Sequence, residues 1–319
     1  MIGVTIALLL ATSAAGALPP LDGAFINVEQ KNLAQAVTDL ANRNYGIIVV
    51  QYSSNKYHQE ATRLKELDAI FKAADEMAKK KKDKKIVDVY VGLYYDETWN
   101  RAWQTGTTAL RPFLTKNKRT IADIDARYGD HPRFKGWYVA HEIGNAKGPD
   151  AATAADFFER IASACRAYDN KRGKKRLVLV SAYFNPHNKH LQPETFATRL
   201  STIQNRAKFD RVLLQDGVGA RLLDPQQLPK IVTPFYSHIE SALGKGALWG
   251  VVELFCCPKV VSDCQCAQEP SGRGTDDRIV KQKAAIVKHV SRVVAFEFND
   301  IAEKPNSCGT TYCNVAAPN

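Results

Sequence analysis

The sequence predicts a single-domain α/β protein of the (β/α)8 class, the TIM barrel, and three observations lead to it. Eight short runs rich in β-branched and aromatic residues recur along the chain. Their interiors are apolar at both alternate positions, as in Ile47-Ile48-Val49-Val50, which is typical of parallel strands covered on both faces. Segments of helical period separate these runs, and eight such units over roughly 280 residues suit a barrel of typically about 250 residues.

The eight predicted strands are Gly23–Asn27, Gly46–Tyr52, Val87–Tyr94, Gly136–Ala140, Arg176–Ala182, Arg211–Leu214, Leu248–Leu254 and Arg292–Phe298. Amphipathic helical stripes lie between them, for example Phe157, Ile161, Ala164 and Tyr168. A doubly wound open sheet is the alternative. That fold usually carries a glycine-rich phosphate turn after its first strand, whereas this chain continues with Asn27-Val28-Glu29-Gln30, so the barrel is favoured.

Composition and charge narrow the class of protein further. With 45% hydrophobic and 24% charged residues, the chain is neither a disordered nor a collagen-like protein. The net charge is +11, and much of it lies in two runs, 79–85 and 171–176, which precede the third and fifth strands. In a barrel these are loops on the bottom face, so we interpret them as solvated, with adhesion to an acidic surface as the alternative. Nucleic-acid binding is not predicted, because the runs lack interleaved aromatic residues.

The N-terminus predicts secretion. An apolar run, Ile2–Leu10, is followed by small residues that end in Ala15-Gly16-Ala17, a pattern that fits a cleaved signal peptide over residues 1–17. The barrel domain would then occupy 18–319. The run is shorter than the roughly 20 apolar residues that a membrane span needs, so no span is predicted. A buried N-terminal strand is the alternative.

Cysteine usage agrees with an oxidising compartment. Six cysteines lie in the C-terminal third, within a loop after the seventh strand (256–275) and a tail (300–319): Cys256, Cys257, Cys264, Cys266, Cys308 and Cys313. They predict a disulfide-rich loop and tail, and the sequence does not indicate which cysteines pair. The loop and tail would either form a wall beside the barrel mouth or brace the fold. A zinc site is disfavoured, because Cys264-Gln-Cys266 has one intervening residue and Cys256-Cys257 has none. Cys165 is expected to be a small buried hydrophobe.

Polar and aromatic residues follow the predicted strands at their carboxyl ends, where the active sites of barrel enzymes lie. A charged residue that ends an apolar strand is costly unless it has a role there. The residues predicted to bind substrate at this edge are Tyr52, Tyr95, Asp96, Trp99, His141, Asn145, Tyr183, Gln215, Asp216 and Glu297. The aromatic ones among them, together with Trp103, would form platforms for sugar rings.

Two glutamates are the predicted catalytic residues. Glu142 and Glu253 end the fourth and seventh strands, positions that face each other across the mouth of an eight-stranded barrel. Glycoside hydrolysis needs such a pair, one carboxyl to protonate the leaving oxygen and the other to attack the anomeric carbon or activate water. In the alternative interpretation, one of them forms a buried ion pair or caps a helix.

Several segments resemble a known family. They are FKGWYVAHE at 134–142, LLQDGVG at 213–219, VGLYYD at 91–96, and LDGAFI at 21–26 followed by GIIVVQ at 46–51. They are similar to a family of secreted proteins of unassigned function that is regarded as TIM barrels related to glycoside hydrolases.

The resemblance implies likeness to the retaining barrel glycosidases, which carry the acid/base on the fourth strand and the nucleophile on the seventh. Glu142 and Glu253 match these two positions. The chain departs from that pattern in having His141 where an asparagine commonly precedes the acid/base, so this histidine would tune the pKa of Glu142 or bind substrate.

The predicted function is therefore that of a secreted glycoside hydrolase acting on a poly- or oligosaccharide. Three alternatives stay open: a carbohydrate-binding barrel without catalysis, a metal-assisted hydrolase using His141, Asp216, Glu297 and Asp300, and a basic surface-adhesion protein. Neither a dinucleotide-binding glycine turn nor a P-loop occurs, so no cofactor is predicted, and no metal motif supports the metal-assisted alternative. The sequence does not indicate an oligomeric state.

Overall fold

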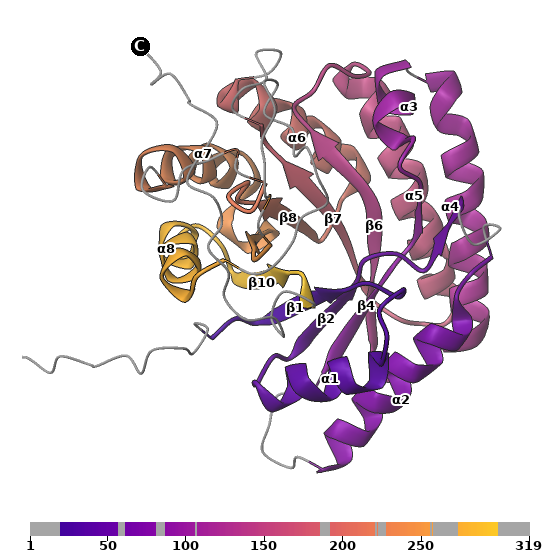
Figure 1. Ribbon diagram of the computed structural model, residues 1–319. Coiled ribbons are helices and arrows are strands. Elements are labelled where there is room, and N and C mark those ends of the chain that lie inside the picture. Colours follow the sequence, from indigo (N-terminus) through magenta and orange to yellow (C-terminus); the bar gives the residue numbers. More distant parts are fainter. Residues whose placement is uncertain are drawn as a thin grey trace, which may run out of the picture.

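Eight parallel strands close into a barrel in the computed structural model, in the order β1-β10-β9-β8-β7-β6-β4-β2 (Figure 1). The structure describes residues 20–56, 61–80, 87–105, 107–185, 192–220, 222, 228–255, 257 and 274–298. The barrel strands are β1 (Gly23–Ile26), β2 (Ile47–Val50), β4 (Asp88–Gly92), β6 (Phe134–Gly144), β7 (Leu177–Tyr183), β8 (Arg211–Gln215), β9 (Leu248–Glu253) and β10 (Arg292–Phe296). This confirms the predicted TIM barrel. The predicted signal peptide lies outside the described residues.

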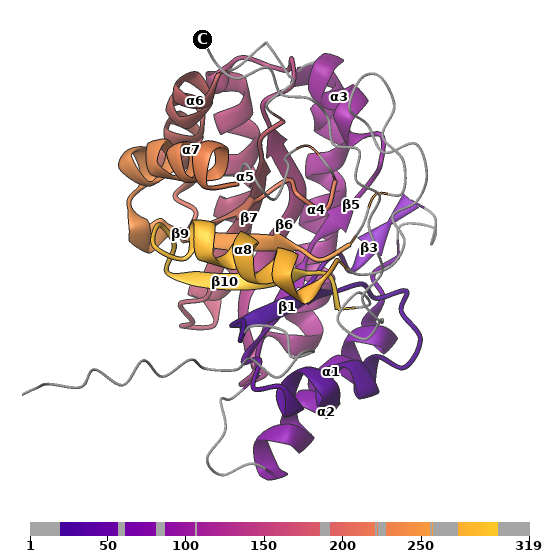
Figure 2. The same ribbon diagram turned by 60° about the vertical axis from the view of Figure 1, so that its left-hand side comes forward.

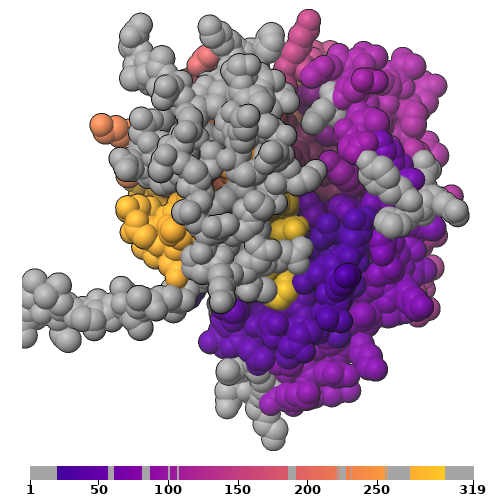
Figure 3. Space-filling view, viewed as in Figure 1, coloured from indigo at the N-terminus to yellow at the C-terminus, as the bar shows by residue number. Residues whose placement is uncertain are grey.

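Helices surround the barrel on its outside, as the two views in Figures 1 and 2 show. They are α1 (Leu33–Asn42), α2 (Leu64–Lys80), α3 (Trp99–Thr105), α4 (Thr107–Tyr128), α5 (Ala151–Lys171), α6 (Pro193–Ala207), α7 (Leu228–Leu243) and α8 (Asp276–Ile286). A short 3-10 helix, Lys245–Ala247, precedes β9. On the face drawn in Figure 3, α1 and α2 form the indigo and violet surface at the bottom, and α8 contributes the yellow surface.

The predicted third strand divides into two elements. Its first part is β4, and its last residue, Tyr94, begins β5 (Tyr94–Tyr95), which leaves the barrel to pair with β3 (Ser54–Asn55) in a separate two-stranded sheet. The fourth strand is longer than predicted, because β6 continues to Gly144, four residues beyond its predicted end. Both differences lie at the carboxyl ends of the strands, where the candidate site is built.

Side chains fill the inside of the barrel. The ring of Phe25 on β1 meets those of Tyr138 on β6 and Phe296 on β10, with centroids 5.4 and 5.3 Å apart. β1 and β6 are not neighbours in the sheet, so the first contact crosses the interior. The Tyr138 hydroxyl also lies 2.8 Å from the Ser181 hydroxyl on β7. The inside of the barrel is thus a packed core and not a pore.

The outer helices pack by the stripes that the sequence predicts. In α5, Phe157 and Ile161 are buried, and the side chain of Asp150 caps the helix by accepting a 2.8 Å hydrogen bond from the Thr153 N–H. Cys165 is buried without a disulfide, as expected of a small hydrophobe, and burial raises the pKa of its thiol well above the ordinary value. None of the helices in the described part of the chain is long and apolar enough to cross a membrane.

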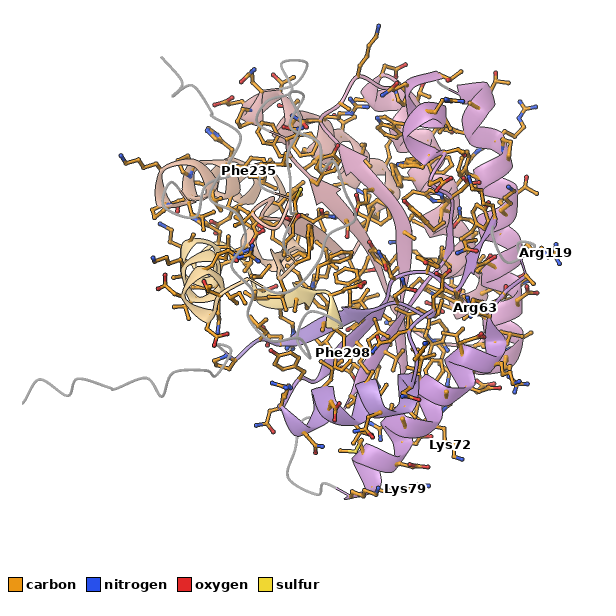
Figure 4. The ribbon with its side chains drawn as sticks, viewed as in Figure 1. Arg63, Lys72, Lys79, Arg119, Phe235 and Phe298 are labelled. Carbon is orange, nitrogen blue, oxygen red and sulfur yellow. The ribbon has the colours of Figure 1, made fainter. Side chains whose placement is uncertain are left out.

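The second basic run is partly structural, which corrects the interpretation of it as a solvated loop. Arg176 is buried and pairs with Asp169 at 2.5 Å, while its guanidinium lies over the Phe134 ring. Arg172 pairs with Asp125 and Asp130 at 2.8 and 2.6 Å. These pairs tie α4 and α5 to the lower ends of the strands. The first run differs, since Lys79 lies on the outward face of α2 (Figure 4) and 81–85 fall outside the described residues.

Candidate active site

Glu142 and Glu253 lie where the sequence places them, on the fourth and seventh strands around the barrel. Glu142 is near the carboxyl end of β6 and is partly buried. Glu253 is the last residue of β9 and is 4% exposed. The charge of Glu142 is among the causes that raise the pKa of Glu253, so the two carboxyl groups lie within electrostatic reach of each other. The barrel mouth therefore holds a pair of interacting carboxyls.

A bulge in β6 positions Glu142. Val139 pairs with Val180 of β7, but the next pair joins Ile143 to Ala182. Ala140, His141 and Glu142 thus stand opposite a single residue of β7, and the register of the two strands shifts between these pairs. Bulges of this kind bend a strand and redirect its side chains, often beside an active site. The strand end that carries Glu142 is accordingly irregular, which the period of the sequence does not reveal.

Side chains from β8 and from α3 hold the Glu142 side chain and backbone. Gln215, the last residue of β8, donates a 2.6 Å hydrogen bond from Nε2 to Oε1 of Glu142. The Trp99 indole N–H donates to the Glu142 carbonyl at 3.0 Å. Burial raises the pKa of the Glu142 carboxyl, against the opposing effect of the Gln215 bond. Burial and the Glu142 charge also raise the pKa of Tyr95 to about 12, which places this phenol near the carboxylate.

Glu253 is held by the loop that follows β8. The backbone N–H of Ala220 donates to Oε2 of Glu253 at 2.9 Å. Gly219 passes so close that a Cβ there would lie 2.7 Å from Cβ of Glu253 and 2.8 Å from the Phe255 carbonyl oxygen, so only glycine fits. Burial, followed by the charge of Asp216, raises the pKa of Glu253 to about 8. This carboxyl keeps its proton to a much higher pH than an ordinary glutamate.

Asp216 lies beneath Glu253 and is 2% exposed. It accepts hydrogen bonds from the Val218 N–H at 3.1 Å and from Gln282 Nε2 at 2.7 Å, and Gln282 also donates to the Glu253 carbonyl at 3.1 Å. Burial raises the pKa of Asp216 to about 6. The prediction of a sugar-binding role for Asp216 is therefore corrected. This carboxylate is engaged by protein donors and acts on Glu253 through its charge.

Two supporting residues were missed by the sequence reasoning, and both come from α8. They are Gln282 and Arg278, whose Nη2 donates to the carbonyls of Glu253, Leu254 and Phe255 at 3.0, 2.7 and 3.0 Å. Both side chains are buried although the helix lies on the outside of the barrel. Their spacing of four residues on one face of a predicted helix is the signal that could have identified them.

His141 and Trp99 lie behind the mouth, which corrects the prediction that they contact substrate. His141 is fully buried, its ring centroid 4.6 Å from that of Trp99 and 5.3 Å from that of Phe113. Its Nδ1 lies 3.4 Å from the side-chain nitrogen of Asn117, and burial lowers its pKa to about 3, so the imidazole is neutral. Trp99 is 4% exposed. The two rings support the backbone of Glu142 rather than a sugar.

Asp96 and Asn145 also serve the scaffold rather than a ligand. Asp96 accepts from the N–H and hydroxyl of Thr98 at 2.9 and 2.7 Å and from the Tyr94 hydroxyl at 2.9 Å. Burial acts to raise the pKa of Asp96, but these bonds outweigh it and the pKa is lowered. The Asn145 amide pairs with both the N–H and the carbonyl of Asn185, at 2.9 and 2.8 Å. The predicted substrate contacts of both residues are corrected accordingly.

The other predicted binding residues surround the mouth. Tyr52 and Tyr95 stack with centroids 5.5 Å apart, and the Tyr183 ring lies against Gly144, where a Cβ would be 2.7 Å from Cε1. Gln215 and Glu297 are partly buried at the ends of β8 and β10, and the Phe296–Glu297 peptide is cis. Their contacts with a sugar stay a prediction.

Several predicted features lie beyond the reach of the described structure. Of the six C-terminal cysteines, only Cys257 is among the described residues, where it is buried and its N–H donates to the Gly219 carbonyl at 3.0 Å. The disulfide framework therefore stays a prediction. Asp300 is also outside the described residues. Within them, no group of three or more His, Cys, Asp or Glu side chains is arranged to hold a metal.

Solved structures that are similar to this one include glycoside hydrolases. The chain is 16% identical to a “putative alpha-L-fucosidase” from Bacteroides thetaiotaomicron, with a TM-score of 0.65 over 93% of this chain and 90% of that one. It is 11% identical to an endo-beta-1,4-mannanase from Thermotoga petrophila, with a TM-score of 0.58 over 88% and 68%. It is also 11% identical to an intracellular xylanase from Thermoanaerobacterium saccharolyticum, with a TM-score of 0.54 over 91% and 92%. At these identities the likeness concerns the fold alone.

The comparison of sequences gives the family. No curated protein sequence matches the chain. A family model described as a domain of unknown function, DUF4434, matches residues 21–309, nearly the whole described structure. This confirms the resemblance to a family of unassigned function built as a barrel related to glycoside hydrolases. The chain therefore belongs to the DUF4434 family and shares the barrel fold of the glycoside hydrolases to which its structure is similar.

Proposed function

We propose that the protein is a glycoside hydrolase that acts on a poly- or oligosaccharide through Glu142 and Glu253. The observation that carries the proposal is the pair itself: two buried or partly buried carboxyls at the ends of the fourth and seventh strands, whose charges interact. Burying two carboxylates together is costly, and their pKa values rise in consequence. A protein maintains such a pair where it needs one protonated and one ionised carboxyl at the same place.

The proposed chemistry proceeds in two steps. Glu142 donates its proton to the glycosidic oxygen while the Glu253 carboxylate attacks the anomeric carbon, so that the bond to the leaving sugar breaks as the glycosyl-enzyme bond forms. Glu142 then takes a proton from water, and the water oxygen displaces Glu253 from the sugar. Gln215 orients the first carboxyl, and the Ala220 N–H orients the second.

We assign the roles of acid/base to Glu142 and of nucleophile to Glu253 from the resemblance to retaining barrel glycosidases. In the free protein, however, the proton of the pair lies on Glu253. The pKa of Glu253 is raised to about 8, because it is buried beside Asp216. Two interacting carboxyls titrate as a pair, so the species with one proton is what matters. We propose that this proton lies on Glu142 in the reactive complex.

A second function has a specific observation in its favour. The described mouth holds stacked tyrosines, Tyr52 and Tyr95, which suit a barrel that binds carbohydrate without cleaving it. Such a protein would have no need for a raised pKa at Glu253, and we therefore place hydrolysis first. Secretion, proposed from the apolar N-terminal run and the cysteine-rich C-terminal third, is compatible with either function.

Substitution of each glutamate tests the proposal. The wild-type protein is assayed for new reducing ends on a panel of neutral and acidic polysaccharides, alongside Glu142→Gln and Glu253→Gln. Both variants are expected to lose about 10³-fold or more in kcat/KM with sugar binding intact, because general acid–base catalysis alone contributes about 10²–10⁴-fold. Glu76→Gln, an exposed change on α2, is the control. Binding without turnover in the wild type, unchanged in both variants, would establish the carbohydrate-binding alternative instead.

A further inference from the structure

A cavity lies outside the barrel mouth, between the loop after β6 and helix α6. Its volume is about 430 Å³, within the range of small-ligand sites. It is lined by residues 146–151 and by Thr195, Thr198, Arg199 and Thr202 of α6. Neither glutamate of the candidate pair lines it. The loop begins just after Gly144, where β6 ends, so the cavity adjoins the edge of the barrel that carries Glu142.

A buried arginine forms one wall of this cavity. Arg199 is 9% exposed, and its guanidinium lies over the Trp103 ring, 5.0 Å from the centroid. Its Nη2 donates to the Pro149 carbonyl at 2.7 Å, whereas its Nε has no hydrogen-bond partner among the described residues. No ion pair in the described part of the chain joins Arg199 to a carboxylate. Because Nε is buried, a ligand would have to meet the terminal nitrogens of the guanidinium. Burial lowers the pKa of Arg199 and outweighs the charge of Asp150, which acts to raise it, so the protein compensates this buried charge only in part.

The wall is fixed by close packing. A Cβ on Gly148 would lie 2.0 Å from Nε1 of Trp103, so the loop can cover the indole only with glycine at this position. The loop is anchored at its start by the paired amide of Asn145 and at its end by Asp150, which caps α5. Arg199 is thus sandwiched between an indole and a rigid loop. Such a site is preorganised, and little conformational entropy is lost when it binds a ligand.

The remaining lining is polar and carries a second cation. Lys147 is exposed at the rim, and Asp150 is the acidic residue of the lining. Both Asp150 oxygens already accept from Thr153, at 2.8 and 2.9 Å, so this carboxylate is turned to the helix that it caps. Two threonines of α6, Thr195 and Thr198, present exposed hydroxyl-bearing side chains. The cavity therefore offers a guanidinium, an ammonium and hydroxyl groups to a ligand.

We propose that this cavity binds an acidic sugar residue of the polysaccharide, with its carboxylate on Arg199. The inference rests on the proposed function and specifies its substrate class as a carboxylated polymer. The planar fork of arginine matches the two oxygens of a carboxylate. The threonine hydroxyls suit the hydroxyls of the same ring. The net charge of +11 favours the approach of a polyanion.

Binding measurements on a catalytically disabled protein test the proposal without turnover. The full chain with Glu253→Gln is titrated with polygalacturonate, alginate and hyaluronan, each against its fully methyl-esterified form, which keeps the sugars but removes the charge. The protein is expected to prefer the free acid. Adding Arg199→Gln should weaken that binding about 10- to 100-fold, the value of a hydrogen-bonded charge pair, and leave binding of the ester unchanged.

Further variants separate recognition from packing. Arg199→Lys keeps the charge but loses the fork, so it should recover only part of the affinity. Lys147→Gln lies at the exposed rim and should weaken binding by a few-fold without changing the melting temperature. Arg119→Gln, on the outward face of α4 (Figure 4), is the matched control and should change nothing. If Arg199→Gln fails to fold, Lys147→Gln and a cavity-filling Thr195→Trp carry the test.

The outcomes are distinct from those of the hydrolase test. Equal affinity for acid and ester, binding to none of the three acids, or a preference for sulfated polymers alone would overturn the proposal, as would a folded Arg199→Gln protein with unchanged affinity. If the glutamate variants show no loss of turnover while Arg199→Gln weakens acid binding, the cavity stands as an acidic-sugar site and the catalytic pair does not.

Discussion

Gln215 donates a 2.6 Å hydrogen bond to the carboxylate of Glu142, and the chain then continues from Gln215 into the loop that holds Glu253. One strand end, that of β8, therefore positions both members of the carboxyl pair. Asp216, the residue after Gln215, lies beneath Glu253 on the buried side. Side chains alternate along a strand, so the consecutive residues Gln215 and Asp216 point to different sides. Gln215 is the hydrogen-bond donor to Glu142, and Asp216 carries the charge that raises the pKa of Glu253.

Loss of the Gln215 contact should impair activity without unfolding the protein. In Gln215→Ala, Glu142 loses the bond that lowers its pKa, so its carboxyl is less well oriented and its pKa rises further. Hydrogen bonds to charged groups are worth about 1.5–3 kcal/mol, so kcat/KM should fall roughly 10- to 100-fold. Gln35→Ala, which removes an exposed bond to Asp39, is the control. Wild-type kcat/KM in Gln215→Ala would contradict this role.

The pH dependence of kcat/KM should extend unusually far into the alkaline range. Because the pKa of Glu253 is raised to about 8, the pair keeps one proton up to that pH, and the alkaline limb of the profile should lie near it. Asp216→Asn removes a negative charge that raises this pKa, so the limb should move to lower pH. The buried Gln282 amide can turn its free oxygen towards the new amide. An alkaline limb at the ordinary glutamate value in the wild type would refute this assignment.

The Glu253→Gln substitution should lower the activity of the protein but raise its stability at pH 8. A carboxyl whose pKa is raised on folding binds more protons in the folded than in the unfolded state, so its contribution to stability decreases as pH rises from the unfolded value of about 4.3 to about 8. Glu253→Gln removes this loss. The variant should melt above the wild type at pH 8 and approach it at pH 4, as calorimetry would show. A lower melting temperature at pH 8 would indicate that the side chain is not penalised by burial.

Gly219 should tolerate no side chain. A methyl group there would lie 2.7 Å from Cβ of Glu253, and either the loop or the carboxyl must move. Overpacking typically costs about 1–3 kcal/mol, and Gly219→Ala should lose that stability together with most of the activity. Gly246→Ala is the matched control, since a Cβ at that position would meet nothing within 4 Å. Equal activity of the two variants would show that Glu253 is not held by this loop.

The barrel and the two glutamates could be predicted from the sequence because both depend on local pattern. The apolar strands repeat along the chain, and the residue at the end of each strand can be read directly. The bulge at His141 could not be predicted, since it arises from the pairing of β6 with β7 rather than from the residues of β6 alone. For the same reason Trp99, which looked like a sugar platform, proved to be part of the buried wall behind Glu142.

The support beneath Glu253 comes from distant sequence. Arg278 and Gln282 reach it from α8 only because the barrel closes and brings that helix against the end of β9. In a sequence pattern, a polar residue on an outer helix is expected to be exposed. Arg199 escaped notice for the same reason, as its burial depends on a loop from β6 and an indole from α3.

Joint action of Glu142 and Glu253 as acid/base and nucleophile can be tested by trapping the covalent intermediate. The wild-type protein is incubated with an activated 2-deoxy-2-fluoro derivative of the sugar that it cleaves, digested, and analysed by mass spectrometry. We expect a single glycosyl adduct, carried by Glu253 and absent in Glu253→Gln. An adduct on Glu142, or none on a protein that still turns over its natural substrate, would contradict these roles.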